Sequence, residues 1–304
     1  MISGKRILIT GGAGFLGKKI IERYYSENDI VVYSRDEAKH YMLKKQYPKV
    51  NFAIGDIYDY ESLNEASKGV DIGIFAASMK QIESCEENPL QAIRTIGLGA
   101  INSKKAAIEN NFESAVFISS DKACSATTIY GACKYVAEQA FLDEKNHSLN
   151  SCRYGNVMNS TGSIFPVIAD AIKNDRNLTL FGESMTRFLI HTDEAIDLIE
   201  FALRDKGCGV YIPKLKSVKI KDIFEIYKEN FGLRFEVGIP RPNEKIHELL
   251  FSSEESPRMI DKGKYQIISK NQSNNGAQEC YSSDRFLMDK KEVYNTLEKH
   301  GFFL

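Results

Sequence analysis

The sequence lacks any stretch of about 18 apolar residues, the length that a membrane-spanning helix needs, so no transmembrane segment is expected. It also lacks an excess of either charge, because 40 lysines and arginines face 41 aspartates and glutamates. A general attraction to nucleic acid or to an anionic membrane is therefore not expected, and any anionic ligand must be held by local groups. The strand-like run Lys5–Thr10 begins almost at the initiator Met, which predicts no signal peptide.

The sequence is equally poor in clustered metal ligands. Its six cysteines contain no C-x-x-C pair, and its five histidines are scattered, so neither a metal site nor a disulfide framework is expected. Because neither a signal peptide nor a membrane span is expected, we predict a cytoplasmic protein with reduced thiols.

The first half of the sequence does contain a regular alternation of β-branched runs and helical patterns. Strands are predicted at Arg6–Thr10, Ile30–Ser34, Asn51–Ile54, Ile72–Ala76, Ala115–Ser119 and Ser151–Tyr154. Helices are predicted at Gly17–Tyr25, Asp36–Gln46, Tyr60–Ser67, Pro89–Asn110 and Tyr130–Asn146. This alternation is typical of βαβ units, and it predicts an α/β fold with a Rossmann-type, doubly wound parallel sheet.

After Asn156 the alternation loosens, and helices are predicted at Ile164–Asn174, Thr192–Arg204, Lys219–Phe231 and Lys290–His300. The segment Ser252–Ser283 is predicted as an irregular stretch or a hairpin. We therefore predict a dinucleotide-binding domain over residues 1–156. Residues 157–304 are predicted to form mainly a smaller substrate lobe, with some segments returning to the first domain.

A glycine-rich segment, Gly11–Gly17, follows the first predicted strand and opens a helix, which is the context that a dinucleotide fingerprint requires. Small residues there allow a tight turn, close approach of the backbone to a pyrophosphate, and an anion at the helix N-terminus. The predicted cofactor contacts are Thr10, Gly11, Gly14, Phe15, Leu16 and Gly17.

The second predicted strand ends in Ser34-Arg35-Asp36, where an NAD enzyme usually presents an acidic side chain to the ribose 2′-hydroxyl. The guanidinium of Arg35 pairs well with a 2′-phosphate, so NADP is favoured over NAD. The acidic Asp36 beside it argues for NAD instead. The alternative for Arg35 is a solvated surface charge without a ligand. Gly55-Asp56-Ile57 follows the third strand and resembles the segment whose aspartate contacts adenine in enzymes of this type. The alternative is a plain turn without a ligand contact. The predicted contacts in this region are Ser34, Arg35, Lys39, Asp56 and Ile57.

The fifth predicted strand runs into Ser119-Ser120-Asp121-Lys122, and Tyr130 and Lys134 follow. Because Tyr130 and Lys134 are four residues apart, they lie on one helix face, where the ammonium can lower the phenol pKa and hold the nicotinamide ribose. Tyr130 could then exchange a proton with a sugar hydroxyl while hydride passes to the nicotinamide.

Asp121 and Lys122 suggest chemistry beyond alcohol oxidation. An acid and an amine beside Tyr130 could serve a β-elimination, in which a proton leaves a carbon next to a ketone and a hydroxyl is protonated as it departs. A 4-epimerase needs no such pair, and a solvated loop pair is the alternative interpretation.

Several segments together resemble one family over nearly the whole chain, the inverting UDP-N-acetylglucosamine 4,6-dehydratases of bacterial surface-sugar biosynthesis in their soluble form. The segments are Tyr33–Glu37, Ala76–Lys80, Asn88–Leu90, Ser120–Ala123, Tyr130–Lys134, Arg153–Val157, Met185–Phe188 and Arg241–Glu248.

The resemblance implies that Tyr130 and Lys134 support oxidation at sugar C4, with Ser120 beside them. It implies that Asp121 is the acid for loss of the C6 hydroxyl and Lys122 the base at C5, after which hydride returns to C6. Further cofactor contacts implied are Ala76, Ala77, Lys80 and Val157. Substrate contacts implied are Lys80, Asn156, Thr161, Gly162, Ser163, Ile164, Phe165, Pro166, Arg187, Arg241 and Glu244. Relatives pair through the helices predicted at Pro89–Asn110 and Tyr130–Asn146, so a homo-oligomer is expected.

The sequence departs from the family pattern at several positions. Ser120 stands where the family has threonine, and Asn243 stands where it has glycine. Ile96 replaces an asparagine that helps to organise the catalytic lysine in the family. Ser78–Gln81 replaces the family sequence Ala-Leu-Lys-His. Other readings therefore stay open: a 4-epimerase, a 4-reductase, a dehydratase that stops at an alkene, or a non-catalytic protein that binds nucleotide sugars.

Overall fold

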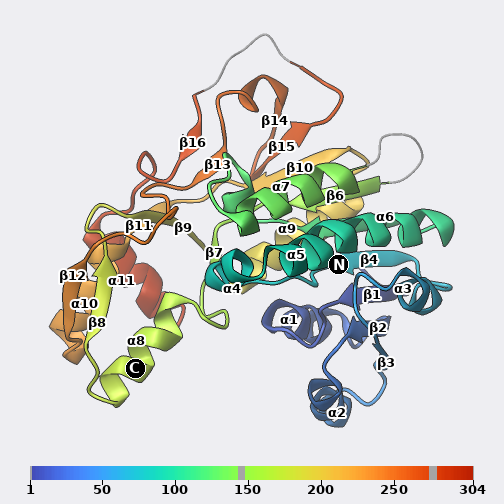
Figure 1. Cartoon of the computed structure of the whole chain (residues 1–304), viewed down its shortest axis with the longest axis horizontal. Coiled ribbons are helices and arrows are strands. Elements are labelled where there is room, and N and C mark those ends of the chain that lie inside the picture. The colour runs from blue at the N-terminus through green and yellow to red at the C-terminus, as the bar shows by residue number, and fades with distance from the viewer. Residues whose placement is uncertain (1, 143–147, 274–278, 304) are drawn as a thin grey trace.

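The computed structural model describes residues 2–142, 148–273 and 279–303, and its centre is a nine-stranded sheet (Figure 1). The strand order is β14-β15-β10-β6-β5-β4-β1-β2-β3. The strands are β1 (Arg6–Thr10), β2 (Asp29–Ser34), β3 (Asn51–Ile54), β4 (Ile72–Phe75), β5 (Ser114–Ile118), β6 (Ser148–Cys152), β10 (Gly209–Pro213), β14 (Met259–Lys262) and β15 (Tyr265–Ser269). From β3 to β10 the neighbouring strands are parallel, and the hairpin β14–β15 adds an antiparallel edge.

Helices cover both faces of this sheet, as the alternation of side chains along β1 requires. Ile7 and Ile9 belong to the apolar cluster under α1 (Phe15–Tyr24), α2 (Glu37–Gln46) and α9 (Thr192–Arg204). Leu8 belongs to the opposite cluster, under α3 (Tyr60–Ala66), α6 (Gly99–Glu109) and α7 (Ile129–Phe141). The predicted Rossmann-type α/β fold is confirmed.

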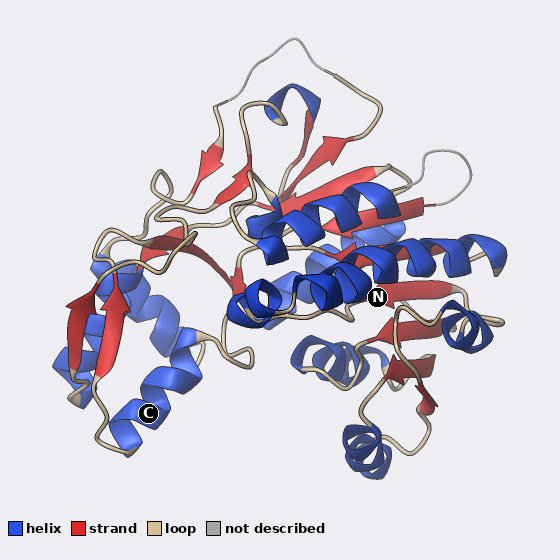
Figure 2. Ribbon diagram, viewed as in Figure 1, coloured by secondary structure: helices blue, strands red, loops and turns tan. Residues whose placement is uncertain are grey.

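A smaller lobe lies beside the carboxyl ends of the strands (Figure 2). Its strands are β7 (Asn156–Val157), β8 (Leu178–Phe181), β9 (Thr186–Ile190), β11 (Ser217–Lys219) and β12 (Phe235–Gly238). Its helices are α8 (Ile164–Lys173), α10 (Ile220–Phe231) and α11 (Lys290–Lys299). Phe165, Phe224, Tyr227 and Leu297 lie in its own apolar core.

Three further elements lie against the main sheet. The strands β13 (Leu249–Phe251) and β16 (Tyr281–Ser282) pair with each other and contribute buried residues to the apolar cluster that contains Ile7 and Ile9. The short turn η3 (Ser256–Arg258) leads directly into β14.

Most predicted elements begin and end within two residues of the observed ones, and the differences have local causes. The helix predicted over Pro89–Asn110 is interrupted, because α5 (Pro89–Ala92) and α6 are joined by a π-helical turn, η1 (Ile93–Leu98). The strand predicted at Ser151–Tyr154 lies earlier, at β6, since the chain leaves the sheet after Cys152. The helix α4 (Ile82–Glu87), the strand β10 and the short strands that separate the later helices were not predicted.

The predicted hairpin within Ser252–Ser283 is present as β14–β15, and it extends the main sheet. The helix predicted over Tyr130–Asn146 ends at Phe141. Residues 143–146 of that prediction and residues 274–278 of the predicted segment Ser252–Ser283 lie outside the described residues. Within the described ranges, no helix is both long and apolar enough to cross a bilayer.

A buried ionic triad ties the main sheet to the later part of the chain. Arg153, which follows β6 and is fully buried, pairs with Glu138 of α7 and, at 2.8 Å, with Glu255. Ser119, at the end of β5, donates to Glu138 Oε2 over 2.6 Å. Because burial makes a broken ionic contact costly, this triad holds the end of β5, helix α7 and the segment after β13 in one fixed arrangement.

Candidate active site

A cleft of ≈ 710 Å³ runs along the carboxyl ends of the parallel strands and continues toward the smaller lobe. Such a position, at the switch point of an open α/β sheet, is where ligands bind in this fold class. Most of the predicted site residues line it: Gly11, Gly14, Phe15, Leu16, Gly17, Ser34, Arg35, Lys39, Asp56, Ile57, Ala76, Ala77, Lys80, Ser120, Lys122, Tyr130, Lys134, Asn156, Val157, Thr161, Gly162, Ser163, Arg187, Arg241 and Glu244.

Five predicted residues do not line the cleft. Thr10 is buried, and its hydroxyl accepts from the backbone N–H of Ala77 over 3.2 Å, so it joins the end of β1 to the segment after β4. Asp121 is buried behind the cleft wall. The other three, Ile164, Phe165 and Pro166, open α8. Phe165 is buried in the apolar core of the smaller lobe, and Ile164 packs against that core.

The glycine-rich loop has the geometry of an anion site. Gly11 has φ +68°, and a Cβ there would lie 2.9 Å from the backbone of Ala77. A Cβ at Gly17 would lie 2.4 Å from Gly12, so the start of α1 packs directly on the loop. Gly14 is the N-cap of α1 and contributes no side-chain cap, which leaves the first-turn N–H groups and the positive end of the helix dipole to a ligand.

Two acidic groups neutralise part of the charge at the rim. Arg35 Nη1 lies 3.1 Å from Asp56 Oδ2, and Lys39 Nζ lies 2.7 Å from Asp36 Oδ2. Asp36 also accepts a hydrogen bond from the Lys39 backbone N–H and so caps the N-terminus of α2. Its carboxylate, which lies where NAD enzymes have a ribose contact, is therefore used in capping the helix. Asp56 Oδ1 is buried and has no hydrogen-bond partner among the described residues.

Tyr130 and Lys134 lie on one face of α7, whose first turn is capped by the Thr128 hydroxyl. Burial raises the pKa of Tyr130 to about 12, against the lowering effects of the Lys122 charge and the Ser120 hydroxyl. Lys134 Nζ donates to the Ile118 carbonyl over 2.6 Å, and burial lowers the pKa of Lys134 to about 7. Among the charges around Tyr130, that of Lys122 lowers its pKa most, and the expected effect of Lys134 on the phenol stays a prediction.

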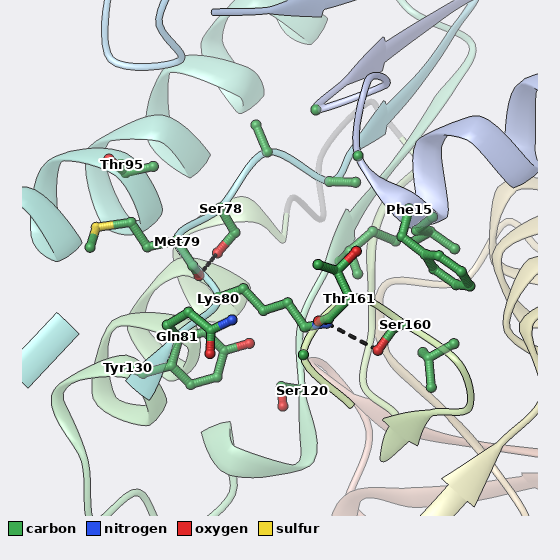
Figure 3. A pocket seen from close by; sticks show the side chains of 18 of the residues that line it. Phe15, Ser78, Met79, Lys80, Gln81, Thr95, Ser120, Tyr130, Ser160 and Thr161 are labelled. Atoms are coloured by element: carbon green, nitrogen blue, oxygen red, sulfur yellow. Dashed lines mark hydrogen bonds between the residues drawn. The ribbon is translucent and has the colours of Figure 1, made fainter. Parts of the chain in front are cut away.

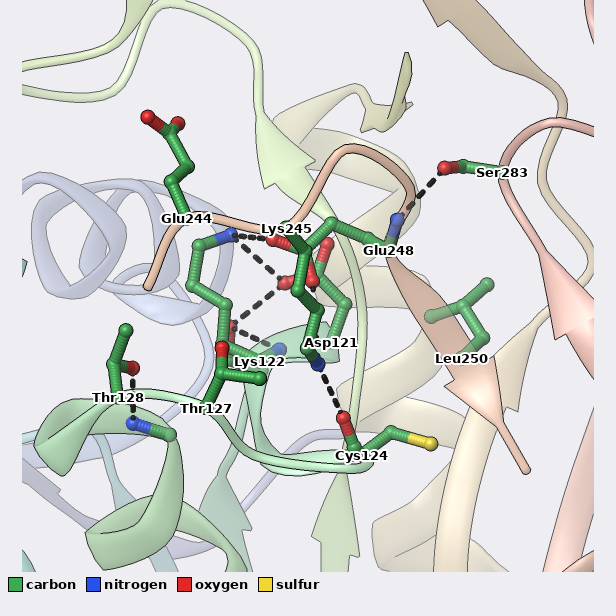
Figure 4. Close-up of polar contacts among 12 residues, drawn as sticks. Asp121, Lys122, Cys124, Thr127, Thr128, Glu244, Lys245, Glu248, Leu250 and Ser283 are labelled. Atoms are coloured by element: carbon green, nitrogen blue, oxygen red, sulfur yellow. Dashed lines mark hydrogen bonds and ion pairs between the residues drawn. The ribbon is translucent and has the colours of Figure 1, made fainter. Parts of the chain in front are cut away.

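Lys122 is the cleft-facing member of a polar cluster (Figure 4). Its Nζ lies 3.2 Å from Asp121 Oδ1, 3.3 Å from Glu248 Oε1 and 3.4 Å from Asn156 Oδ1. Ser120 Oγ, which lines the cleft, donates to Asp121 Oδ1 over 3.0 Å, so a hydroxyl stands between the buried acid and the cleft. Burial raises the pKa of Asp121, although the Lys122 charge opposes this.

Basic side chains follow the cleft toward the smaller lobe. Lys80 Nζ donates to Ser160 Oγ over 3.0 Å, which joins the segment after β4 to the loop before α8 (Figure 3). Arg187 Nη2 pairs with Glu244 Oε1 at 2.9 Å and is nearly buried. Arg241 is more exposed and pairs with Glu83.

Several cleft residues were missed by the sequence analysis, among them Glu83, Thr95, Tyr154 and Ser160. Glu248 was also missed as a partner of Lys122, although it closes the conspicuous segment Arg241–Glu248. Its sequence position gave no indication of this contact, because the two residues are far apart in the chain.

Known proteins resemble this chain along most of its length. The profile of the polysaccharide biosynthesis protein family matches residues 7–270. The chain belongs to this family. An inverting UDP-N-acetylglucosamine 4,6-dehydratase of Campylobacter jejuni is 35% identical over 282 residues, covering 88% of this chain and 84% of the relative.

Other members of the family carry a different activity in their names. A UDP-glucose 4-epimerase of Rickettsia felis is also 35% identical, over 285 residues, with the same coverage of 88% and 84%. Among solved structures, Pen from Bacillus thuringiensis superimposes with a TM-score of 0.92 at 29% identity and covers 99% of both chains. Family membership thus leaves two related activities to be separated by the site itself.

Proposed function

We propose that the protein is a UDP-N-acetylglucosamine 4,6-dehydratase that uses NADP and gives a UDP-2-acetamido-2,6-dideoxy-4-hexulose, with inversion at C5. The observation that carries this proposal is the position of Lys122, which faces the same cleft as Tyr130 and contacts two carboxyl groups. An acid–base cluster beside a tyrosine–lysine pair suits an elimination that follows an oxidation. The Campylobacter jejuni relative has this activity in its name.

The residues at the first end of the cleft fit a dinucleotide. The close approach at Gly11 and the uncapped start of α1 suit a pyrophosphate, and the unpartnered Asp56 Oδ1 suits an adenine amino group. Arg35 and Lys39, both at the rim, would hold a 2′-phosphate. A nicotinamide held there would supply the hydride acceptor for C4 and the hydride donor for C6.

In the oxidation, Tyr130 would take the proton of the C4 hydroxyl, with Ser120 positioning that hydroxyl. The cation of Lys122 and the Ser120 hydroxyl both favour the phenolate that this step requires. Lys134, held by the Ile118 carbonyl, would bind the nicotinamide ribose.

In the elimination, Lys122 would remove the C5 proton once C4 is a ketone. Asp121 would supply the proton on which the C6 hydroxyl leaves as water. Since Asp121 is buried, its proton would reach the sugar through Ser120 Oγ, which contacts both the acid and the cleft.

The rest of the cleft would hold the UDP group and the sugar. Arg187 and Arg241 offer planar donors for the diphosphate, and Glu244 can accept from ribose hydroxyls. Lys80, Asn156 and the loop Thr161–Ser163 lie nearer the catalytic groups and would contact the hexose.

We also propose a homo-oligomer in the cytoplasm. Large apolar side chains are exposed on the outer faces of α5, η1, α6 and α7, which are the helices expected to pair: Leu90, Ile93, Leu98, Ile101, Tyr135 and Val136. The described residues, which include all six cysteines, contain no disulfide, in keeping with a reducing compartment.

The test is incubation of the purified protein with UDP-N-acetylglucosamine and NADP, followed by mass spectrometry and NMR. A product lighter by one water supports the dehydratase, and NMR then assigns a 4-ketone or an alkene and the configuration at C5. A product of unchanged mass with inverted C4 would instead establish the epimerase named in the Rickettsia felis relative. No turnover would favour a nucleotide-sugar-binding protein.

A further inference from the structure

Glu248 lies behind Lys122 as seen from the cleft, at the end of the segment Arg241–Glu248. Its carboxylate is 2% exposed and does not line the main cleft, whereas Lys122 does. Figure 4 shows dashed lines from the Lys122 ammonium to the carboxyl groups of Asp121 and Glu248. The 3.3 Å contact between Lys122 Nζ and Glu248 Oε1 therefore offers a direct route for a proton between the cleft and Glu248.

The charges around Glu248 are fixed by its surroundings. Although burial acts in the opposite direction, the cations of Lys122, Arg187 and Lys245 lower the pKa of Glu248, so its carboxylate is ionised. Lys245 Nζ lies 3.7 Å from Glu248 Oε2, and this oxygen accepts no hydrogen bond from the described residues. Glu248 is thus a carboxylate with a vacant acceptor atom.

These charges create a difficulty for Lys122 as a base. Burial lowers the pKa of Lys122, but Asp121 and Glu248 outweigh burial and raise it above its usual value. An amine held as an ammonium ion has no lone pair for the C5 proton. It can act only if its own proton leaves as the new one arrives.

We propose that Glu248 is the proton acceptor for Lys122 during the elimination, an inference that rests on the dehydratase function proposed above. The C5–H bond breaks and its proton binds Lys122 Nζ, while an ammonium proton of Lys122 passes to Glu248 Oε1. The electron pair left at C5 forms the C5–C6 double bond as the C6–O bond breaks. The departing hydroxyl takes the proton of Asp121 and leaves as water.

This exchange keeps the buried cluster neutral. The starting state that the proposal requires has Asp121 protonated, which burial favours, and Lys122 as an ammonium ion held by the ionised Glu248 3.3 Å away. Afterwards Asp121 is ionised, Lys122 is still an ammonium ion and Glu248 is protonated. An uncompensated charge in a buried site is costly. The barrier to elimination is therefore lower when Glu248 accepts a proton as Asp121 gives one up. Glu248 acts through Lys122, and so it is a positioning residue rather than a group that touches the sugar.

The direct test compares Glu248→Gln with Glu248→Asp. In single turnovers with UDP-N-acetylglucosamine, Glu248→Gln should still reduce NADP within about 3-fold of the parent rate, because C4 oxidation does not use Glu248. Exchange of the C5 hydrogen with D₂O and loss of water should both fall by about 10²–10⁴-fold. Glu248→Asp, which restores a carboxylate, should recover part of both. Glu254→Gln, the same change at an exposed position in the next loop, is the matched control and should leave all three rates unchanged.

A second variant tests the proposal even where Glu248→Gln does not fold. Lys245→Gln leaves Glu248 in place and removes one of the cations that face it, while Lys122, Arg187 and the neighbouring Asp121 remain. The Glu248 pKa should therefore rise, and the acid limb of the pH profile for water loss should move to higher pH. A purely structural role of Glu248 would not move that limb.

The outcomes separate the two proposals. Three results would each overturn the role of Glu248. The first is water loss at the parent rate in Glu248→Gln, and the second is an acid limb that stays in place in Lys245→Gln. The third is a loss of C4 oxidation in Glu248→Gln equal to its loss of C5 exchange. If the parent protein itself releases no water from the substrate, the proposed function fails.

Discussion

Arg35 and Asp56 form an ion pair across the carboxyl ends of β2 and β3, with Nη1 and Oδ2 3.1 Å apart. The Arg35 side chain is 62% exposed, so most of its donors face the rim of the cleft, while that of Asp56 is 16% exposed. Asp56 therefore orients the guanidinium and leaves its other N–H groups available to a phosphate. This arrangement differs from the carboxylate that contacts the ribose in NAD enzymes.

The first prediction concerns this choice of cofactor. Arg35→Ala should weaken NADP binding by about 10-fold or more, the usual effect of losing charge-assisted hydrogen bonds, and should leave NAD binding almost unchanged. Titration of both dinucleotides into nucleotide-free protein by calorimetry measures this. Lys39→Ala, which removes a lysine paired with Asp36, should have the smaller effect. Equal losses for NADP and NAD would contradict a 2′-phosphate contact.

The second prediction concerns assembly. Val136 on α7 and Ile93 in η1 are 57% and 53% exposed, and α7 packs against η1. Light scattering at micromolar concentration should show an oligomer, and the double variant Ile93→Asp, Val136→Asp should be a monomer because charged side chains resist burial. Val237→Asp, at a similarly exposed site in β12, is the control and should stay oligomeric. A monomeric parent would refute the prediction.

The parts of the site that depend on short sequence distances could be predicted. Gly11–Gly17 form the turn into α1, and Tyr130 and Lys134 lie four residues apart on α7. In both cases the spacing along one short segment alone sets which groups face the cleft. Contacts between distant segments could not be read in this way. The Lys122–Glu248 contact arises only when the segment after β12 folds over η2 (Asp121–Ala123).

Burial was the other property that local patterns did not disclose. Asp121 follows Ser120 in the sequence and was expected beside the sugar, but the turn η2 directs it away from the cleft surface. The π-helical turn η1 likewise depends on how α5 and α6 pack against α7, which no local pattern specifies.

The third prediction follows from the low pKa of Lys134. Its folded-state pKa is about 7, whereas an unfolded lysine has a pKa of about 10.4. Between pH 7 and about 8.5 the unfolded chain holds a proton at Lys134 that the folded chain has lost, so the free energy of unfolding rises with pH. Relative to Lys134→Met, this rise should approach 1.4 kcal/mol per pH unit, which is the value for one proton. Urea unfolding across this range measures it, and parallel curves for the two proteins would count against it.

The fourth prediction concerns Ile96, where the resembled family carries asparagine. Ile96 is 1% exposed and belongs to the apolar cluster that contains Tyr130 and Cys133. Ile96→Asn should lower the free energy of unfolding by about 1–3 kcal/mol, because it buries an amide among apolar side chains. Ile96→Leu, which keeps the volume, should cost less than about 1.5 kcal/mol. An asparagine variant as stable as the parent would mean that the amide finds a polar partner, for which Thr95 is the nearest candidate in the sequence.

The last prediction separates the two halves of the proposed reaction. Tyr130 is placed to act on the C4 hydroxyl, whereas Asp121 and Lys122 form an acid–amine pair suited to C5 and C6. Tyr130→Phe should therefore abolish the transient absorbance of NADPH as well as the product. Asp121→Asn combined with Lys122→Ala should still oxidise C4 and accumulate NADPH, without losing water.

Single-turnover absorbance and mass spectrometry follow the two events in the same sample. Loss of one general acid or base costs about 10²–10⁴-fold in rate, so the two variants should differ by more than the error of either measurement. Removal of Lys122 also takes away the cation that lowers the Tyr130 pKa, so oxidation in the double variant should need a higher pH than in the parent. Near-parent dehydration by the double variant would remove the elimination role from Asp121 and Lys122, and it would favour the epimerase or reductase chemistry instead.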